Sequence, residues 1–149
     1  MRLAADTSFL FSLYGKDDWT ETAREMSCSF GAAIHLTVFN TLELTNAALH
    51  AEFAGHLEAG LGKLIVSRFE KEKKSGRLVS PSFSPSKAIA RATELSRRYT
   101  LSEGHRTYDV LLVAAALEIK ATDFLTFDDR QAKLAKAEGL RVHQDWEAG

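Results

Sequence analysis

The sequence has little cysteine, no excess of one charge and no long apolar run. The only cysteine, Cys28, cannot form an internal disulfide, which suits a reducing compartment such as the cytoplasm. The 19 basic and 20 acidic residues nearly cancel, so overall charge draws the chain to neither nucleic acid nor membrane. The longest apolar run, Val110 to Leu117, is far shorter than the roughly 18 residues of a membrane span. We expect a soluble cytoplasmic protein without a membrane partner.

The length and the order of apolar segments predict a single α/β domain. A chain of 149 residues with 45% hydrophobic content is long enough for one well-buried core and short for two, so we expect one domain over residues 1–149. Short apolar segments alternate with stretches of helical periodicity and with helix start and stop signals. Such an order is typical of a mostly parallel sheet with helices on both faces, an α/β/α arrangement.

The individual elements follow from apolar spacing, caps and glycines. Strands are expected at 3–5, 33–36, 77–80, 124–127 and 140–143. Helices are expected at 9–14, 18–30, 85–99, 107–119 and 129–138, and a long helical stretch from 37 to 74 should break near Gly60 and Gly62. Thr7 or Ser8 is the expected cap of the first helix and Thr37 that of the long one.

Two acids follow predicted strands directly. Asp6 comes after the first strand, and Asp128 comes after the strand at 124–127. The carboxyl ends of parallel strands form the crevice in which such sheets bind ligands, so both acids are site candidates. Turn or cap duty is an equally ordinary role for each of them. Asp129, one residue further on, is well placed to cap the following helix.

Two further acids lie near predicted helix starts. Asp109 is the only polar residue of the segment DVLLVAAAL, so it must lie beside buried surface, although acids are also common in the first turn of a helix. Glu43 lies between Leu42 and Leu44, where a solvated surface residue is the ordinary alternative. In a parallel sheet, both helix starts can bring these acids to the edge that carries Asp6 and Asp128.

Four carboxylates gathered at one edge would repel each other strongly. Such repulsion either raises their pKa values or is relieved by a bound cation, and oxygen ligands suit Mg²⁺ or Mn²⁺. A divalent metal can hold a phosphate, lower the pKa of a bound water and stabilise charge during an in-line displacement. The acids therefore indicate phosphodiester hydrolysis.

The same segments resemble a known family, the PIN-domain ribonucleases, and within it the VapC-type toxins. The resemblance covers nearly the whole chain, through ADTSFLFSLY, FNTLELTNAA, TYDVLLVAAAL and FLTFDDRQAKLAKAEGL, which contain Asp6, Glu43, Asp109 and Asp128 in that order. It implies a three-layer α/β/α fold and an acidic Mg²⁺ or Mn²⁺ centre that cuts RNA, with these four acids as metal ligands. Ser8 and Thr126 are then candidates to orient the carboxylates or waters, or else plain capping and strand-end residues.

The resemblance also implies partner proteins, and the chain departs from the pattern of the family at one position. It implies a small antitoxin that binds the chain and blocks the acidic crevice. The apolar faces of residues 9–14 and of the helix around Phe53 are candidates for an antitoxin or homodimer surface, although an apolar stripe at helical spacing is more often part of the core. Relatives with the third motif often carry a histidine where this chain has Leu112. This departure favours, as an alternative, a non-catalytic RNA-binding or scaffold PIN domain. A phosphotransfer domain that uses Asp6 or Asp128 as its phosphorylated acid would leave Asp109 and Glu43 unexplained.

Overall fold

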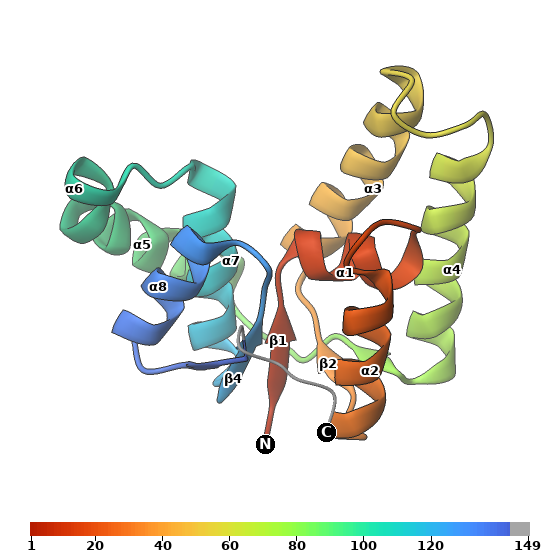
Figure 1. Cartoon of the computed structure of the whole chain (residues 1–149). Coiled ribbons are helices and arrows are strands. Elements are labelled where there is room, and N and C mark those ends of the chain that lie inside the picture. Colours follow the sequence, from red (N-terminus) through yellow and green to blue (C-terminus); the bar gives the residue numbers. More distant parts are fainter. Residues whose placement is uncertain (144–149) are drawn as a thin grey trace.

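A parallel sheet runs through the centre of the molecule (Figure 1). The computed structural model describes residues 1–143. Its strands are β1 (Leu3–Ala5), β2 (Ile34–His35), β3 (Leu78–Val79), β4 (Asp123–Leu125) and β5 (Arg141–Val142). Their order in the sheet is β3-β2-β1-β4-β5, and each neighbouring pair is parallel. The fully parallel sheet confirms the prediction made from the alternation of strands and helices.

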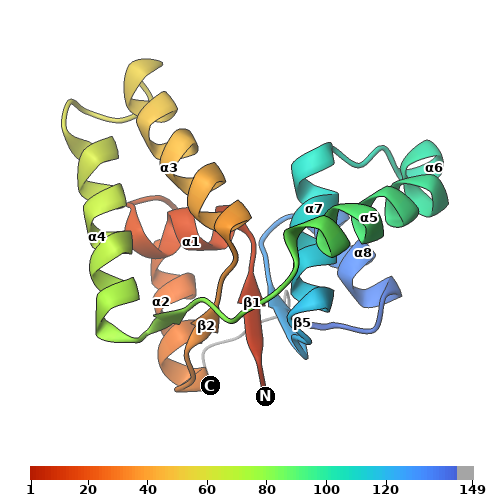
Figure 2. The same ribbon diagram turned by 180° about the vertical axis from the view of Figure 1, so that it is seen from behind.

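Helices cover both faces of this sheet. They are α1 (Thr7–Tyr14), α2 (Thr20–Phe30), α3 (Val38–Phe53), α4 (Leu61–Ser75), α5 (Pro85–Leu95), the π-helical turn η1 (Ser96–Thr100), α6 (Leu101–Glu103), α7 (Thr107–Glu118) and α8 (Asp129–Ala137). Figures 1 and 2 show α1 to α4 on one side of the sheet and α5 to α8 on the other. Within the described residues, no helix is long and apolar enough to cross a membrane.

The central strands are buried on both faces because successive side chains point in opposite directions. Leu3 and Ala5 of β1 pack in the core under α1 to α4, whereas Ala4 packs in the core under α5, α7 and α8. In β4, Leu125 belongs to the first of these cores and Phe124 to the second. The chain therefore has the three-layer α/β/α architecture that the sequence predicted.

Several helix boundaries differ from expectation, since α1 begins at Thr7 and not at residue 9, and α2 at Thr20 and not at residue 18. The first helix is capped by Asp6, whose carboxylate accepts a hydrogen bond from the Phe9 amide, so the assignment of the cap to Thr7 or Ser8 was wrong. The helix that begins at Pro85 runs through η1 and α6 before Gly104 ends it in a left-handed conformation. The long helical stretch breaks between α3 and α4, as expected from Gly60 and Gly62.

Candidate metal centre

Asp6 lies at the carboxyl end of β1 and is almost fully buried. Its backbone amide donates to the Leu125 carbonyl at 3.0 Å, which extends the β1–β4 pairing by one residue. Its carboxylate accepts hydrogen bonds from the hydroxyls of Ser8, at 2.8 and 2.9 Å, and of Thr126, at 2.6 Å. Both hydroxyls predicted to orient carboxylates therefore contact Asp6. The sequence left two roles open for Asp6, a helix cap and a site residue at the end of the strand. The structure shows that Asp6 caps α1 and also lies at the strand end.

Asp128 caps the helix that follows β4, but it does not follow the strand directly as predicted, because β4 ends at Leu125 and not at residue 127. Its carboxylate accepts a hydrogen bond from the Gln131 amide at 2.9 Å and so caps α8. Its own amide donates to the Thr126 hydroxyl at 3.0 Å, and this same hydroxyl contacts Asp6. Asp129 is the first residue of α8, so it starts the helix as expected, but the capping role predicted for it belongs to Asp128.

Glu43 reaches the site from the second turn of α3. The start of this helix is fixed to β1 by Asn40, whose side-chain amide donates to the Ala5 carbonyl at 2.9 Å. The carbonyl of the same side chain accepts from the Thr37 amide at 3.0 Å in a capping box. Asn40 is buried, and this anchor sets where Glu43 lies relative to Asp6.

Asp109 lies in the first turn of α7, where the free amide groups of the helix favour an acid. Its side chain is 23% exposed and accepts from Arg106 Nε at 3.3 Å, so it lies at the border of the core and is paired. Helix α7 contacts both β1 and α3, the elements that carry Asp6 and Glu43. The first-turn role and a place near Glu43 are therefore both realised.

The acids influence one another in two pairs. Burial raises the pKa of Asp6 to about 6, with a smaller contribution from the charge of Asp128, although hydrogen bonds from Thr126, Phe9 and Ser8 oppose the shift. Burial also raises the pKa of Glu43, and the charge of Asp109 adds to this effect. These shifts are the response expected of acids that share a desolvated edge.

Gln131 connects the elements of the site, and the sequence analysis missed it. This side chain is only 1% exposed. Its amide group donates to the Asp109 backbone carbonyl at 3.0 Å, and its Oε1 lies 3.3 Å from the Thr126 hydroxyl. Gln131 therefore ties α8 to the start of α7 and to the end of β4. A signal was present, because Gln131 lies three and four residues before the buried Leu134 and Ala135, and so on the buried face of α8.

A buried hydroxyl lies beside Glu43. Thr7 Oγ1 is buried, and its interaction with the Glu43 carboxylate opposes the rise of the pKa of this acid.

The ligand chemistry of this edge fits a hard cation. The candidate ligands are carboxylate oxygens, the type that Mg²⁺ and Mn²⁺ prefer. Within residues 1–143, however, no three His, Cys, Asp or Glu side chains lie close enough together to hold one ion directly. Mg²⁺ usually keeps several waters and is held by one or two carboxylates, so the two acid pairs fit a hydrated ion.

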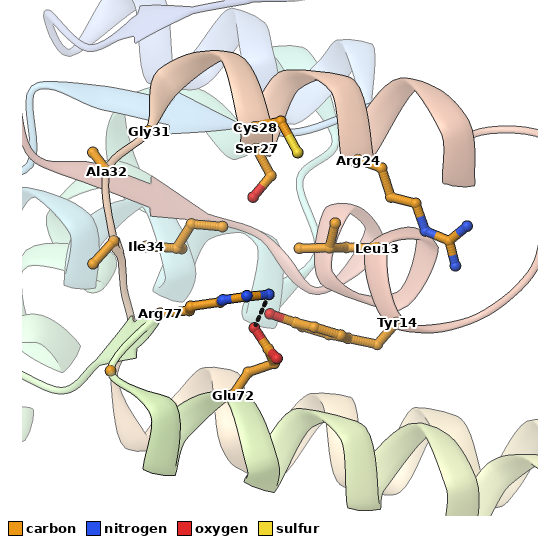
Figure 3. Close-up of a pocket in the computed structure, with 12 residues that line it drawn as sticks. Leu13, Tyr14, Arg24, Ser27, Cys28, Gly31, Ala32, Ile34, Glu72 and Arg77 are labelled. Carbon is orange, nitrogen blue, oxygen red and sulfur yellow. Dashed lines mark ion pairs between the residues drawn. The ribbon is translucent and has the colours of Figure 1, made fainter.

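A cavity of about 650 Å³ lies elsewhere, at the opposite edge of the sheet. Figure 3 shows it between the ends of α1, α2 and α4, with Ile34 of β2 in its wall and the Glu72–Arg77 ion pair beside Tyr14. None of the four acids lines it. The chemistry that the sequence predicts therefore belongs to the carboxyl edge of the sheet.

Leu112, the residue that departs from the expected motif, is a core residue. It is 3% exposed and packs in the same apolar cluster as Ala4 and Phe124. A buried leucine here completes the packing of α7 on the sheet, and the neighbouring hydrogen bonds of Asp109 and Gln131 do not depend on it.

Solved structures of other proteins have the same fold. VapC20 of Mycobacterium tuberculosis, described as a Sarcin-Ricin loop cleaving toxin, has a TM-score of 0.69 and 14% identity over 94% of this chain and 98% of its own. VapBC2 of Rickettsia felis, solved with a DNA fragment from its promoter, has a TM-score of 0.63 and 17% identity over 96% and 98%. FitAcB of Neisseria gonorrhoeae has a TM-score of 0.54 and 14% identity over 97% and 99%. These likenesses show the fold.

The sequence itself identifies the family. Comparison with curated proteins finds no match. The family profile of the PIN domain, in contrast, matches residues 4–137, a range that includes all four acids. The chain belongs to the PIN-domain family.

Proposed function

We propose that this protein is a divalent-metal-dependent endoribonuclease, the toxin of a toxin–antitoxin pair, built as one domain over residues 1–149. The observation that supports the proposal is the charge interaction within two pairs of acids, Asp6 with Asp128 and Glu43 with Asp109, in a chain of the PIN-domain family. VapC20, which has the same fold, is described as a toxin that cleaves the sarcin–ricin loop, and RNA is accordingly the proposed substrate here.

The four carboxylates would hold Mg²⁺ or Mn²⁺ together with waters. The ion would supply positive charge for the phosphate and a water of lowered pKa for an in-line displacement at phosphorus. Ser8 and Thr126 hold the Asp6 carboxylate in one orientation, and Gln131 fixes the Asp109 backbone. We expect the products to carry a 5′-phosphate and a 3′-hydroxyl.

Cleavage of total cellular RNA by the purified protein tests this function. We expect discrete products with Mn²⁺, none with EDTA, and none from an Asp109→Asn variant that melts like the wild type. Glu25→Gln is the matched control, because it removes an acid from the exposed face of α2. Full activity of the Asp109→Asn variant would refute the site assignment, and full activity in EDTA would refute the metal requirement.

A non-catalytic RNA-binding or scaffold domain is the second candidate. It is favoured by the absence, among residues 1–143, of three acids spaced to hold one ion directly. Metal titration separates the two candidates, since a ligand that binds the folded state raises stability in proportion to the logarithm of its excess over the dissociation constant. An intact centre raises the melting temperature steadily with Mn²⁺, whereas a degenerate one gives no response.

The partners proposed are a small antitoxin and a second copy of this chain, in the cytoplasm. VapBC2, solved with a fragment of its promoter, supports a paired antitoxin. The chain also exposes apolar side chains along α3, namely Val38, Leu42, Leu49 and Phe53. We propose this α3 patch as the homodimer surface, because contiguous exposed apolar residues mark interaction sites. Purification from the native host without a small companion protein would count against the antitoxin.

A further inference from the structure

A groove of about 480 Å³ borders the acidic edge on the side of α1. Thr7 and Ser8, the two residues after Asp6, line it together with Asp128. Its remaining walls come from Phe11, Ser12, Asp17, Trp19, Ala47 and Phe127. The groove is therefore continuous with the proposed metal centre and has the size of a small-ligand site.

Trp19 is the exposed aromatic residue of this groove. Its indole stacks on Phe127 with ring centroids 4.8 Å apart and an interplanar angle of 21°, and Phe127 in turn packs on the buried Phe9 at 5.4 Å. Even so, 52% of Trp19 stays exposed. The three rings run from the core to the surface and end on the half-exposed indole of Trp19.

The backbone around Trp19 is held in place. Asp17 accepts a hydrogen bond from the Trp19 amide at 2.8 Å and another from the Ser12 hydroxyl at 2.8 Å. The Asp17 amide donates to the Thr20 hydroxyl at 2.9 Å, which fixes the start of α2. An aromatic surface held in this way loses little conformational entropy when a flat ligand stacks on it.

The position of the Trp19–Phe127 pair beside Asp128 indicates which kind of ligand the groove binds. Phe127, which supports Trp19, is bonded directly to Asp128, so a phosphate held at the acidic edge places its neighbouring base beside the groove. Successive bases of single-stranded nucleic acid bind by stacking on exposed aromatic side chains, whatever their sequence. An acidic groove otherwise repels a polyanion, so the contact must come from the base.

We propose that Trp19, supported by Phe127, is the stacking platform for an RNA base that flanks the phosphate to be cut. This subsite rests on the proposed ribonuclease function, and it makes an unpaired nucleotide the form of RNA that the enzyme accepts. Duplex RNA, whose bases are already stacked in pairs, is bound less well.

Fluorescence of Trp19 reports base stacking directly. The sequence has two tryptophans, so Trp146→Phe leaves Trp19 as the only one. The probe is a short oligoadenylate in Ca²⁺, compared with a ribose-phosphate chain of equal length without bases. We expect the oligoadenylate to quench the fluorescence and the base-free chain to leave it unchanged. Equal quenching by both, or none by either, would overturn the proposal.

Variants of Trp19 separate stacking from packing. Loss of one base–aromatic contact weakens binding by about 5- to 150-fold. We expect this loss in anisotropy titrations with Trp19→Ala and with Trp19→Leu, which keeps apolar cover over Phe127, whereas Trp19→Phe retains binding. If Trp19→Ala and Trp19→Leu both bound RNA as tightly as the wild type, the subsite would be refuted, whereas the proposed nuclease function would not be affected. Quenching by the oligoadenylate in a protein that cleaves no RNA would refute the nuclease and leave the subsite.

Discussion

At the scale of single residues, the site acids have two roles at once. Asp6 and Asp128 cap α1 and α8; Asp6 directly follows β1, and Asp128 lies in the short turn between β4 and α8. A helix cap needs a carboxylate oxygen beside free backbone amides, and a metal site needs a carboxylate oxygen in the crevice where the ligand binds. A turn that leads from a strand into a helix can place one carboxylate for both roles. The sequence predicted the position of each acid but could not decide between these roles, because both use the same spacing.

The raised pKa of Asp6 makes the stability of the metal-free protein depend on pH. Burial moves this pKa from 3.8 to about 6, so the contribution of Asp6 to stability is fully present below pH 3.8 and is lost as pH rises through 6. The loss is on the order of 3 kcal/mol for so buried a group. Asn keeps the cap but cannot ionise, so Asp6→Asn should gain stability relative to the wild type over this interval.

Urea unfolding in EDTA at several pH values measures this difference. Subtracting the wild-type free energy of unfolding from that of the variant removes the contributions of the other titrating groups. A difference that stays constant between pH 3.8 and 7 would mean that Asp6 ionises normally in the folded protein.

At the scale of elements, Gln131 holds α7, α8 and β4 in register at the site. Its side-chain amide donates to the Asp109 carbonyl, and its backbone amide is the group that Asp128 caps. Periodicity placed α8 within a residue of its observed ends, whereas the contacts of Gln131 depend on the tertiary approach of two helices. The π-helical turn η1 was likewise beyond prediction, since no local signal in SRRYT distinguishes it from the helix that precedes it.

Replacement of Gln131 by Leu keeps its volume and removes both polar groups. The Asp109 carbonyl, which as a residue of α7 also accepts the intrahelical bond, then loses its second donor, and we expect a cost of about 0.5–1.5 kcal/mol of stability. Mutation of a residue that orients metal ligands typically lowers metal affinity by about 10- to 100-fold, and we expect Gln131→Leu to lose Mn²⁺ affinity in this range. Lys136→Gln, on the exposed face of α8, is the control. A variant with lowered stability and wild-type Mn²⁺ affinity would make Gln131 a packing residue only.

At the scale of the whole molecule, the apolar faces divide into core and surface. Residues 9–14, one of the two predicted interaction faces, contribute Phe9 and Leu10 to the core, so the sequence could not tell this face from a packing stripe. The face around Phe53 is different, because 88% of Phe53 is exposed. Whether an apolar face is buried or exposed depends on how the helices pack on the sheet and on each other, which the spacing of apolar residues does not reveal.

Phe53→Asp tests the α3 patch as a dimer surface. We expect light scattering to give a dimer for the wild type and half that mass for the variant, which should still unfold cooperatively but at a lower temperature because it lacks the stabilising partner. Leu101 on α6 is fully exposed on the other side of the sheet, so Leu101→Asp should remain dimeric. A monomeric wild type, or a dimeric Phe53→Asp variant, would rule out this surface.

Binding of Mn²⁺ to the free protein, followed by electron paramagnetic resonance, tests most directly whether the four acids form one centre. We predict saturable binding to the wild type and to Glu25→Gln. In contrast, we expect the Mn²⁺ affinity to fall by at least about 10-fold in each of four variants, Asp6→Asn, Glu43→Gln, Asp109→Asn and Asp128→Asn. Even mutation of residues that only hydrogen-bond to metal ligands has an effect of this size. Wild-type affinity in all four variants, or no binding to the wild type, would contradict a metal centre at this edge of the sheet.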